Sequence, residues 1–452
     1  MKHRSLPLGL GACLALAALS LLLPFGPLFD SWAWLVWGRE LLDLDLDTGA
    51  GPSWKPLPVL VAAPLTLAGD AAPELWLFIV RAGWLAVPVL AWRLAARLEG
   101  SGRGAGVAAG ALAAVSVVLI SDDFTSWVRQ GAGGLSEPVL VALVLGAIEA
   151  ALARRHGLAL GLGLAACLLR PEAWPFAALY AWHLVRAGEA RRAPVVLGAA
   201  MVAGLWLGPD LLAADNALEG AERARGGGFE PGDALTVLGR ALEMPLFLLW
   251  PASLAAVVVA RRRGGRVPGV LAAGAVAWIA LVAAMATAGF AGLPRFMAPA
   301  AALVCVLGAV GTVWSLRSLP PRAAALATAL VILAVVVDGG FRAEKIAGEL
   351  ERARDDEALL EPLARLADAE PGLFSCRPLS VGDFRAQPPL AWELQGPLRE
   401  VLPTTSVFTP GGTLVVGSRT RPELTAEARS RGEPAGRAGS WEVLRTGACA
   451  EP

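Results

Sequence analysis

The chain has 452 residues, of which 56% are hydrophobic and 17% are charged, with equal numbers of basic and acidic side chains. Soluble domains contain about 25% charged residues, so this composition excludes an ordinary soluble protein and indicates a membrane protein. The formal net charge of zero gives no indication of a nucleic-acid partner, and we expect none.

Apolar runs predict a series of membrane helices, because about 20 apolar residues are needed to cross the hydrocarbon core. The first run, residues 6–25, follows the basic N-terminus MKHR. We interpret it as a retained helix rather than a signal peptide, since no clear cleavage site follows it. Further helices are predicted at about 74–96, 105–120, 137–153, 193–212, 243–260, 267–290, 297–314 and 322–338. Two more are predicted, one before and one after residues 170–172. The fold class is therefore an α-helical polytopic membrane protein with about eleven transmembrane helices.

Charge at the helix ends predicts the orientation, because basic residues favour the cytoplasmic side. With the N-terminus in the cytoplasm, basic loops such as RRRGGR fall inside and the acidic motifs fall outside. The apolar stretch at 56–69 is short and interrupted by prolines, so we interpret it as re-entrant or interfacial; a spanning helix there would reverse this agreement. The sequence thus predicts a transmembrane domain at 1–339, with a first external loop at 26–73, in a multi-pass protein of the cell membrane.

The sequence changes character from about residue 340 to the end. Charged residues become more frequent, a helical pattern with mixed charges comes first, and strand-like runs follow at 413–416 and 441–444. We expect a small extracytoplasmic α/β domain at 340–452. Cys376 and Cys449 both lie in it, and cysteines outside the cytoplasm commonly pair, so a Cys376–Cys449 disulfide is predicted.

The segment 29–65 is interpreted as one long polar loop that forms the floor of an active site. Asp30 lies five residues after the first predicted helix, beside three tryptophans, and a carboxylate there is a candidate general base. Two alternatives remain: the tryptophans form an interfacial belt, and Asp30 is the N-cap of a helix that begins at Ser31. Lys55 lies at the depth of lipid phosphates, although snorkelling to the interface would place a lysine there as well.

Alternating acidic residues in the same segment offer a second candidate site. Asp43, Asp45 and Asp47 would share one face of an extended chain, as a divalent-cation site needs. We favour a solvated edge beside the turn TGAGP.

The other outer helix ends also contain charged residues. Asp122, Asp123, Arg129 and Glu137 lie around the segment between the third and fourth predicted helices, and Glu137 begins the fourth, where a carboxylate is costly unless it is paired or N-terminal. Either a solvated rim or a substrate-orienting site would have this composition.

Three further charged residues lie at breaks between apolar runs. Arg170 and Glu172 flank Pro171, and they are interpreted as an internal pair that positions a broken helix. Arg295, in LPRFMAP, is suited to bind a phosphate. The three histidines all fall at the cytoplasmic side, so a histidine-based zinc site or triad outside is not expected.

Taken in order along the chain, these motifs resemble the GT-C membrane glycosyltransferases, in particular the family 39/83-like group of protein mannosyltransferases and aminoarabinose transferases. The resemblance rests on Asp30 after the first helix, on Lys55-Pro56-Leu57-Pro58, on Ser136-Glu137-Pro138, and on Arg295-Phe296 with Pro299. Leu57 replaces a proline of the family pattern, Glu137 replaces an aspartate, and Pro299 lies one position later than in a strict match. The resemblance covers the predicted helices and not the tail from about 340.

The resemblance implies transfer of a sugar from a polyprenyl-phosphate donor to an extracytoplasmic acceptor with inversion. Asp30 would be the catalytic base, Lys55 and Arg295 would bind the donor phosphate, and Asp122, Asp123, Arg129 or Glu137 would orient a substrate. No cofactor is required, because lipid phosphate is a fair leaving group, although a divalent cation remains an alternative. The competing functions are a transporter or flippase of lipid-linked saccharides and a non-catalytic relative. Membrane lipids are the other expected partners.

Overall fold

The computed structural model describes residues 5–100, 102–121, 126–214, 216, 218–226, 233–404 and 411–447. The chain divides by its internal packing into two compact units. The first, here called the helical unit, comprises Met1–Leu22, Phe78–Trp206 and Glu222–Leu350. The second, the mixed unit, comprises Leu23–Leu77, Leu207–Ala221 and Glu351–Pro452. Each unit is therefore assembled from three separate stretches of sequence.

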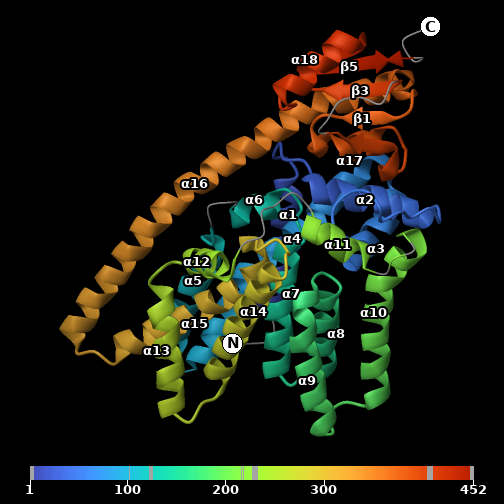
Figure 1. The fold of residues 1–452 in the computed structure, drawn as a ribbon. Coiled ribbons are helices and arrows are strands. Elements are labelled where there is room, and N and C mark those ends of the chain that lie inside the picture. The colour runs from blue at the N-terminus through green and yellow to red at the C-terminus, as the bar shows by residue number, and fades with distance from the viewer. Residues whose placement is uncertain are drawn as a thin grey trace. The chain divides into compact units, whose positions relative to one another are not determined.

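Helices make up most of the chain (Figure 1). The α-helices are α1 (Ser5–Ser20), α2 (Phe29–Leu42), α3 (Pro56–Thr66), α4 (Ala72–Glu99), α5 (Arg103–Val118), α6 (Trp127–Ala132), α7 (Glu137–Leu152), α8 (His156–Cys167), α9 (Trp174–Arg186), α10 (Arg192–Ala214), α11 (Glu219–Gly226), α12 (Ala234–Glu243), α13 (Leu249–Arg262), α14 (Val267–Thr287), α15 (Ala298–Arg317), α16 (Pro321–Ala369), α17 (Gln387–Glu393) and α18 (Pro422–Arg431). Short 3₁₀ helices are η1 (Gly69–Ala71), η2 (Pro171–Ala173), η3 (Pro294–Met297), η4 (Pro371–Phe374), η5 (Phe384–Ala386) and η6 (Leu398–Glu400).

Several helices have the length and composition of membrane spans. In the described part of the chain there are five, namely Gly69–Glu99, Arg192–Ala213, Val267–Thr287, Pro294–Arg317 and Pro321–Ala369, and α1, α3, α5 and α8 are shorter apolar helices. The protein is therefore a multi-pass membrane protein, as its composition indicated. The count of eleven spans and the orientation with a cytoplasmic N-terminus stay predictions.

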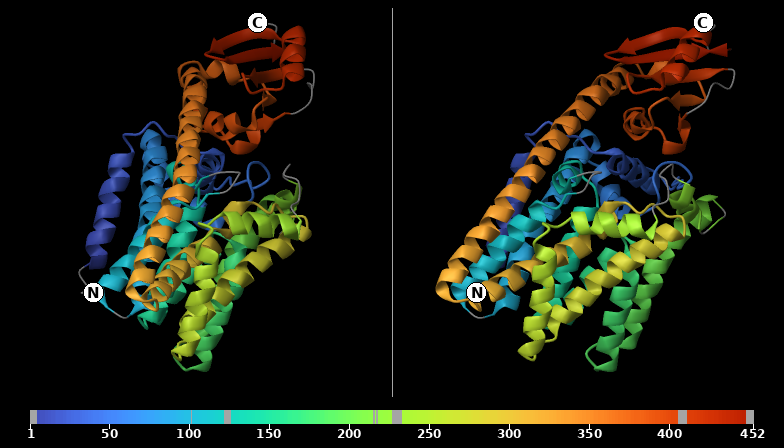
Figure 2. Two further views of the ribbon diagram at one scale, coloured as in Figure 1. Left: turned by 90° about the vertical axis from the view of Figure 1, so that its left-hand side faces the viewer. Right: turned by 60° about the vertical axis from the view of Figure 1, so that its left-hand side comes forward.

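Helix α15 forms the core of the helical unit. Every residue from Ala298 to Trp314 is buried, because the helix is surrounded by α5, α7, α13 and α14. Its sequence is apolar all round, as expected for a fully buried helix. At the edge of this unit, the Cys13 thiol of α1 donates to the carbonyl of Leu85 in α4 over 3.3 Å, and the two helices run side by side in Figure 2.

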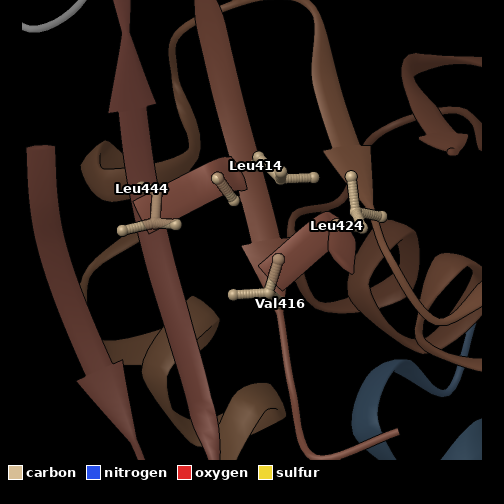
Figure 3. Close-up of a cluster of buried hydrophobic side chains, with 5 residues drawn as sticks. Leu414, Val416, Leu424 and Leu444 are labelled. Carbon is tan, nitrogen blue, oxygen red and sulfur yellow. The ribbon is translucent and has the colours of Figure 1, made fainter. Parts of the chain in front are cut away.

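The mixed unit contains a five-stranded sheet in the order β2-β1-β3-β5-β4. Its strands are β1 (Leu379–Val381), β2 (Val401–Pro403), β3 (Gly412–Val416), β4 (Glu433–Ala438) and β5 (Trp441–Thr446). Strand β1 pairs in parallel with β2 and β3, whereas β5 pairs antiparallel with β3 and β4. Leu414, Val416 and Leu444 of the sheet meet Leu424 of α18 in a buried cluster (Figure 3). The small C-terminal α/β fold predicted from the sequence is thus confirmed, including strands at 413–416 and 441–444.

The interpretation of residues 29–65 as one loop is wrong. The segment forms two helices, α2 and α3, joined by a turn region. Helix α2 buries most of its residues from Ser31 to Glu40, so it is a packed element despite its charges. Helix α3 has 11 residues with Pro64 inside it, which agrees with the prediction that this apolar stretch is too short to span a bilayer.

Two other predicted helix boundaries differ from those in the structure by more than five residues. The last predicted span, 322–338, is the first part of α16, which continues without interruption to Ala369. The charges after Phe341 end the hydrophobic pattern, but they suit an exposed helix. The predicted span at 243–260 instead begins at Leu249, because Pro245 separates α12 from α13.

Candidate active site

Asp30 lies in the first turn of α2, in the mixed unit. Leu28 is the N-cap of this helix, with an extended backbone, so the suggestion that Asp30 is the N-cap is wrong. A carboxylate within the first turn is stabilised by the positive end of the helix dipole. The side chain is half-buried. Asp30 is thus held on a regular helix, with part of its surface accessible to a reactant.

Lys55 immediately precedes α3 and is also in the mixed unit. Its side chain is buried, with 6% of its surface exposed, and its Nζ lies 5.1 Å from the centre of the Trp34 ring. Trp34 follows Asp30 by one helical turn, and residues four apart share one face of a helix. The Lys55 ammonium and the Asp30 carboxylate therefore both belong to the side of α2 that Trp34 occupies.

The chemistry around Lys55 favours an anion. Lys55 is the N-cap of α3, where the helix dipole and free backbone N–H groups attract negative charge. Pro56 and Pro58 lack N–H groups, so fewer backbone donors are available in this first turn. The lysine therefore adds a positive charge to a helix end that has few backbone donors.

Two of the three tryptophans near Asp30 are core residues of the mixed unit, so the interpretation of all three as an interfacial belt is wrong. Trp34 and Trp37 are fully buried. Trp34 packs edge-on against Trp76 with ring centres 5.6 Å apart, and Trp37 lies 5.7 Å from Trp54. These contacts hold α2 against the segments that follow it.

The alternating aspartates interact with an arginine of the C-terminal region. Asp45 is paired with Arg399 over 2.6 Å, and the Nε of Arg399 lies 3.9 Å from a carboxylate oxygen of Asp47. Asp47 also accepts a hydrogen bond from the Gly49 backbone N–H. Asp43 is exposed at the end of α2. These observations agree with a polar edge, the interpretation that was favoured.

A buried ionic cluster in the helical unit includes Glu137 at the first position of α7. Arg170 binds Glu172 through two hydrogen bonds, from Nη2 over 2.7 Å and from Nε over 3.2 Å. The Nη1 of Arg170 donates to Oε1 of Glu137 over 3.3 Å. All three side chains are buried. The predicted Arg170–Glu172 pair is present, and it lies at the extended break between α8 and η2 that Pro171 favours.

Arg295 joins this cluster from η3. Its Nε lies 3.9 Å from Oε1 of Glu137, and the neighbouring Phe296 ring lies under the Arg170 guanidinium at 3.5 Å. Two of the residues selected from the sequence, Glu137 and Arg295, are thus brought together. The two carboxylates, Glu137 and Glu172, and the two guanidinium groups, Arg170 and Arg295, cancel in charge. Each carboxylate lies beside a guanidinium group, as burial of ions requires.

The remaining predicted residues are placed differently. The Nη1 of Arg129, in α6, donates to Glu349 of α16 over 3.2 Å, which gives this arginine a structural partner that the sequence did not suggest. Asp122, Asp123 and Cys449 lie outside the described residues. The Cys376–Cys449 disulfide and the substrate-orienting roles therefore stay predictions. Across the described ranges, no three His, Cys, Asp or Glu side chains form a group that could hold a metal ion.

Comparison with known proteins gives a result at the level of three-dimensional structure. No family model matches the sequence, and no curated protein matches it. The structure is similar to that of ArnT from Cupriavidus metallidurans in the apo state, with 15% sequence identity, 98% of each chain covered and a TM-score of 0.57. The same protein bound to undecaprenyl phosphate matches with 14% identity, the same coverage and the same TM-score. Over nearly its whole length the chain thus has the fold of ArnT, an aminoarabinose transferase of the GT-C membrane glycosyltransferases.

Proposed function

We propose that this protein is a membrane glycosyltransferase that moves a sugar from a polyprenyl-phosphate donor to an extracytoplasmic acceptor with inversion. The observation that supports this most is the ArnT-like fold over 98% of the chain, together with the undecaprenyl phosphate bound by ArnT itself. The arrangement of Asp30 and Lys55 on one side of α2 supplies the chemical groups that such a transfer needs.

In this proposal Asp30 accepts the proton of the acceptor hydroxyl as that oxygen attacks the anomeric carbon. The bond from the anomeric carbon to the phosphate oxygen breaks, and the polyprenyl phosphate leaves with the electron pair. Lys55 stabilises the negative charge that develops on this phosphate, which is where a preorganised cation lowers the barrier. Arg295 is assigned to the same phosphate by the family resemblance, and its role is a separate proposal.

The test is release of polyprenyl phosphate. Purified protein in lipid is incubated with a panel of polyprenyl-phosphate sugars and a crude envelope acceptor. We expect Asp30→Asn to reduce release by at least about 100-fold, the contribution of a general base. Asp43→Asn is the matched control, because it makes the same change at the exposed opposite end of α2, and it should keep wild-type activity. Lys55→Met and Arg295→Lys are assayed in the same way, because Lys55 and Arg295 are the residues proposed to bind the donor phosphate.

The outcomes separate the competing functions. Turnover near the wild-type level in Asp30→Asn contradicts its role as base. If wild-type protein binds a donor but releases no polyprenyl phosphate from any member of the panel, the transferase proposal is wrong, and a transporter or a non-catalytic relative takes its place.

A further inference from the structure

Arg39, near the end of α2, binds the C-terminal end of helix α17. Its two terminal nitrogens donate to the carbonyls of Ala391, Trp392 and Gly396 over 3.1, 3.2 and 2.7 Å, and to the side-chain oxygen of Gln395 over 3.0 Å. The last carbonyls of a helix have no partner within the helix, and a cation is favourable there. Arg39 thus caps α17 although about 350 residues separate the two in sequence.

Glu40, the next residue, makes the complementary contact. Its Oε1 accepts a hydrogen bond from the backbone N–H of Leu398 over 2.7 Å, at the start of η6. One carboxylate oxygen therefore binds a backbone donor while the neighbouring guanidinium binds backbone acceptors. Both contacts are with the stretch 384–400, here called the clamp segment, which comprises η5, α17 and η6.

The first turn of α2 also contacts the clamp segment, through aromatic rings. Phe29 meets Phe384 edge-on with ring centres 5.2 Å apart, and the rings of Trp32 and Trp392 are 6.3 Å apart. Asp30 lies between these two α2 residues in sequence. The clamp segment therefore contacts α2 on both sides of Asp30 and again at the other end of the helix.

From these contacts we infer that the clamp segment positions α2 and thereby sets the location of the Asp30 carboxylate, with Arg39 as the principal positioning residue. This inference rests on the proposed function, in which Asp30 is the base. At 1.5 Å per residue, Arg39 lies about 13 Å along the helix from Asp30. A rigid helix transmits a small rotation at one end to the other. A displacement of about 1 Å at a reacting group can reduce turnover about 100-fold.

The experiment compares Arg39→Ala with the matched control Arg429→Ala in the full-length protein. Arg429 makes hydrogen bonds of similar length, 2.8 and 2.9 Å to Glu442, between α18 and β5 of the same unit. We expect Arg39→Ala to lower kcat about 10- to 100-fold while binding of undecaprenyl phosphate changes less than about twofold. Arg429→Ala should match the wild type. Amide hydrogen exchange should accelerate in 29–42 and 384–400 of Arg39→Ala and stay unchanged elsewhere.

Two further variants keep the inference falsifiable if Arg39→Ala does not fold. Phe384→Ala removes the contact with Phe29 from a ring that is 53% exposed, and Arg39→Lys keeps the charge without the planar fork. Both should show smaller shifts in the same direction. Wild-type kcat and wild-type exchange in α2 for these variants would overturn the inference. If wild-type protein releases no polyprenyl phosphate at all, the proposed function fails, and the exchange measurement alone decides whether the clamp segment holds α2.

Discussion

Glu40 shows how burial changes the chemistry of a single residue. Its side chain is 4% exposed and accepts backbone hydrogen bonds from Leu398 and Asp47. Burial raises the pKa of Glu40 to about 7, although these two N–H donors and the nearby Arg399 oppose the shift. Since the folded-state pKa lies above the ordinary value of 4.5, the fold favours the protonated form. The stabilising contribution of Glu40 is therefore complete below about pH 4.5 and is lost as the pH rises through 7.

We predict that Glu40→Gln removes this pH dependence, because glutamine stays neutral. The free energies of unfolding of the variant and the wild type, measured from pH 5 to pH 8, should diverge in favour of the variant as the pH rises, by up to about 3 kcal/mol. Burial also raises the pKa of Glu393 to about 7, but both proteins contain Glu393, so it cancels in the difference. A constant difference across this pH range would show that Glu40 is not the titrating group.

At the scale of elements, close helix crossings depend on glycines that hydropathy does not identify. Gly311 of α15 faces α13 so closely that a Cβ atom there would collide with the backbone of Ala252 and Ala256. Within the mixed unit, Gly38 of α2 would meet the backbone of Ala63 in α3 at 2.8 Å in the same way. These positions decide how near two helices come, and a larger residue forces them apart.

Gly311→Ala should therefore destabilise the helical unit by about 1–3 kcal/mol, seen as a lower unfolding temperature. The control is Gly274→Ala in α14, where an added Cβ meets nothing within 4 Å. Alanine is the better helix former by about 1 kcal/mol, so this control should be neutral or slightly stabilising. Equal unfolding temperatures for the two variants would contradict the close crossing of α13 and α15.

At the scale of the whole molecule, the mixed unit joins distant parts of the chain. Residues of α2 hydrogen-bond to the clamp segment, and Thr48 donates to Asp210 over 2.7 Å. The first external loop and the C-terminal domain were predicted as separate regions. Because the two regions pack into one unit, the C-terminal domain supports the segment that contains the proposed base, Asp30.

The predicted Cys376–Cys449 disulfide belongs to this scale, because it would tie the end of the chain to the start of the mixed sheet. Cys13, Cys167 and Cys305 are free thiols, so three of the five cysteines should be alkylated in the denatured, unreduced protein. Reduction should add two more alkyl groups, as measured by mass spectrometry. Cys449→Ser should leave Cys376 open to alkylation without reduction, and five alkyl groups on unreduced wild-type protein would rule out the bridge.

The sequence alone determined the features that depend on local pattern. Membrane character, most helix positions and the strands β3 and β5 of the C-terminal sheet follow from hydropathy and its period, which each short segment contains in itself. The Arg170–Glu172 pair was also within reach, because the two residues flank one proline. The GT-C resemblance rested on the order of short motifs, and it predicted the fold that the comparison with ArnT then showed.

Only the tertiary structure decided which distant side chains meet. Arg39 and Glu40 were visible as an adjacent charged pair, but nothing near them in sequence indicates that their partners lie between residues 391 and 398. The meeting of Glu137 with Arg170 and Arg295, and of Arg129 with Glu349, was equally hidden. A buried charge must find a partner, but many arginines and carboxylates in this chain satisfy that rule equally well. Packing of the apolar helices selects among them, because it fixes which charged groups come within hydrogen-bonding distance.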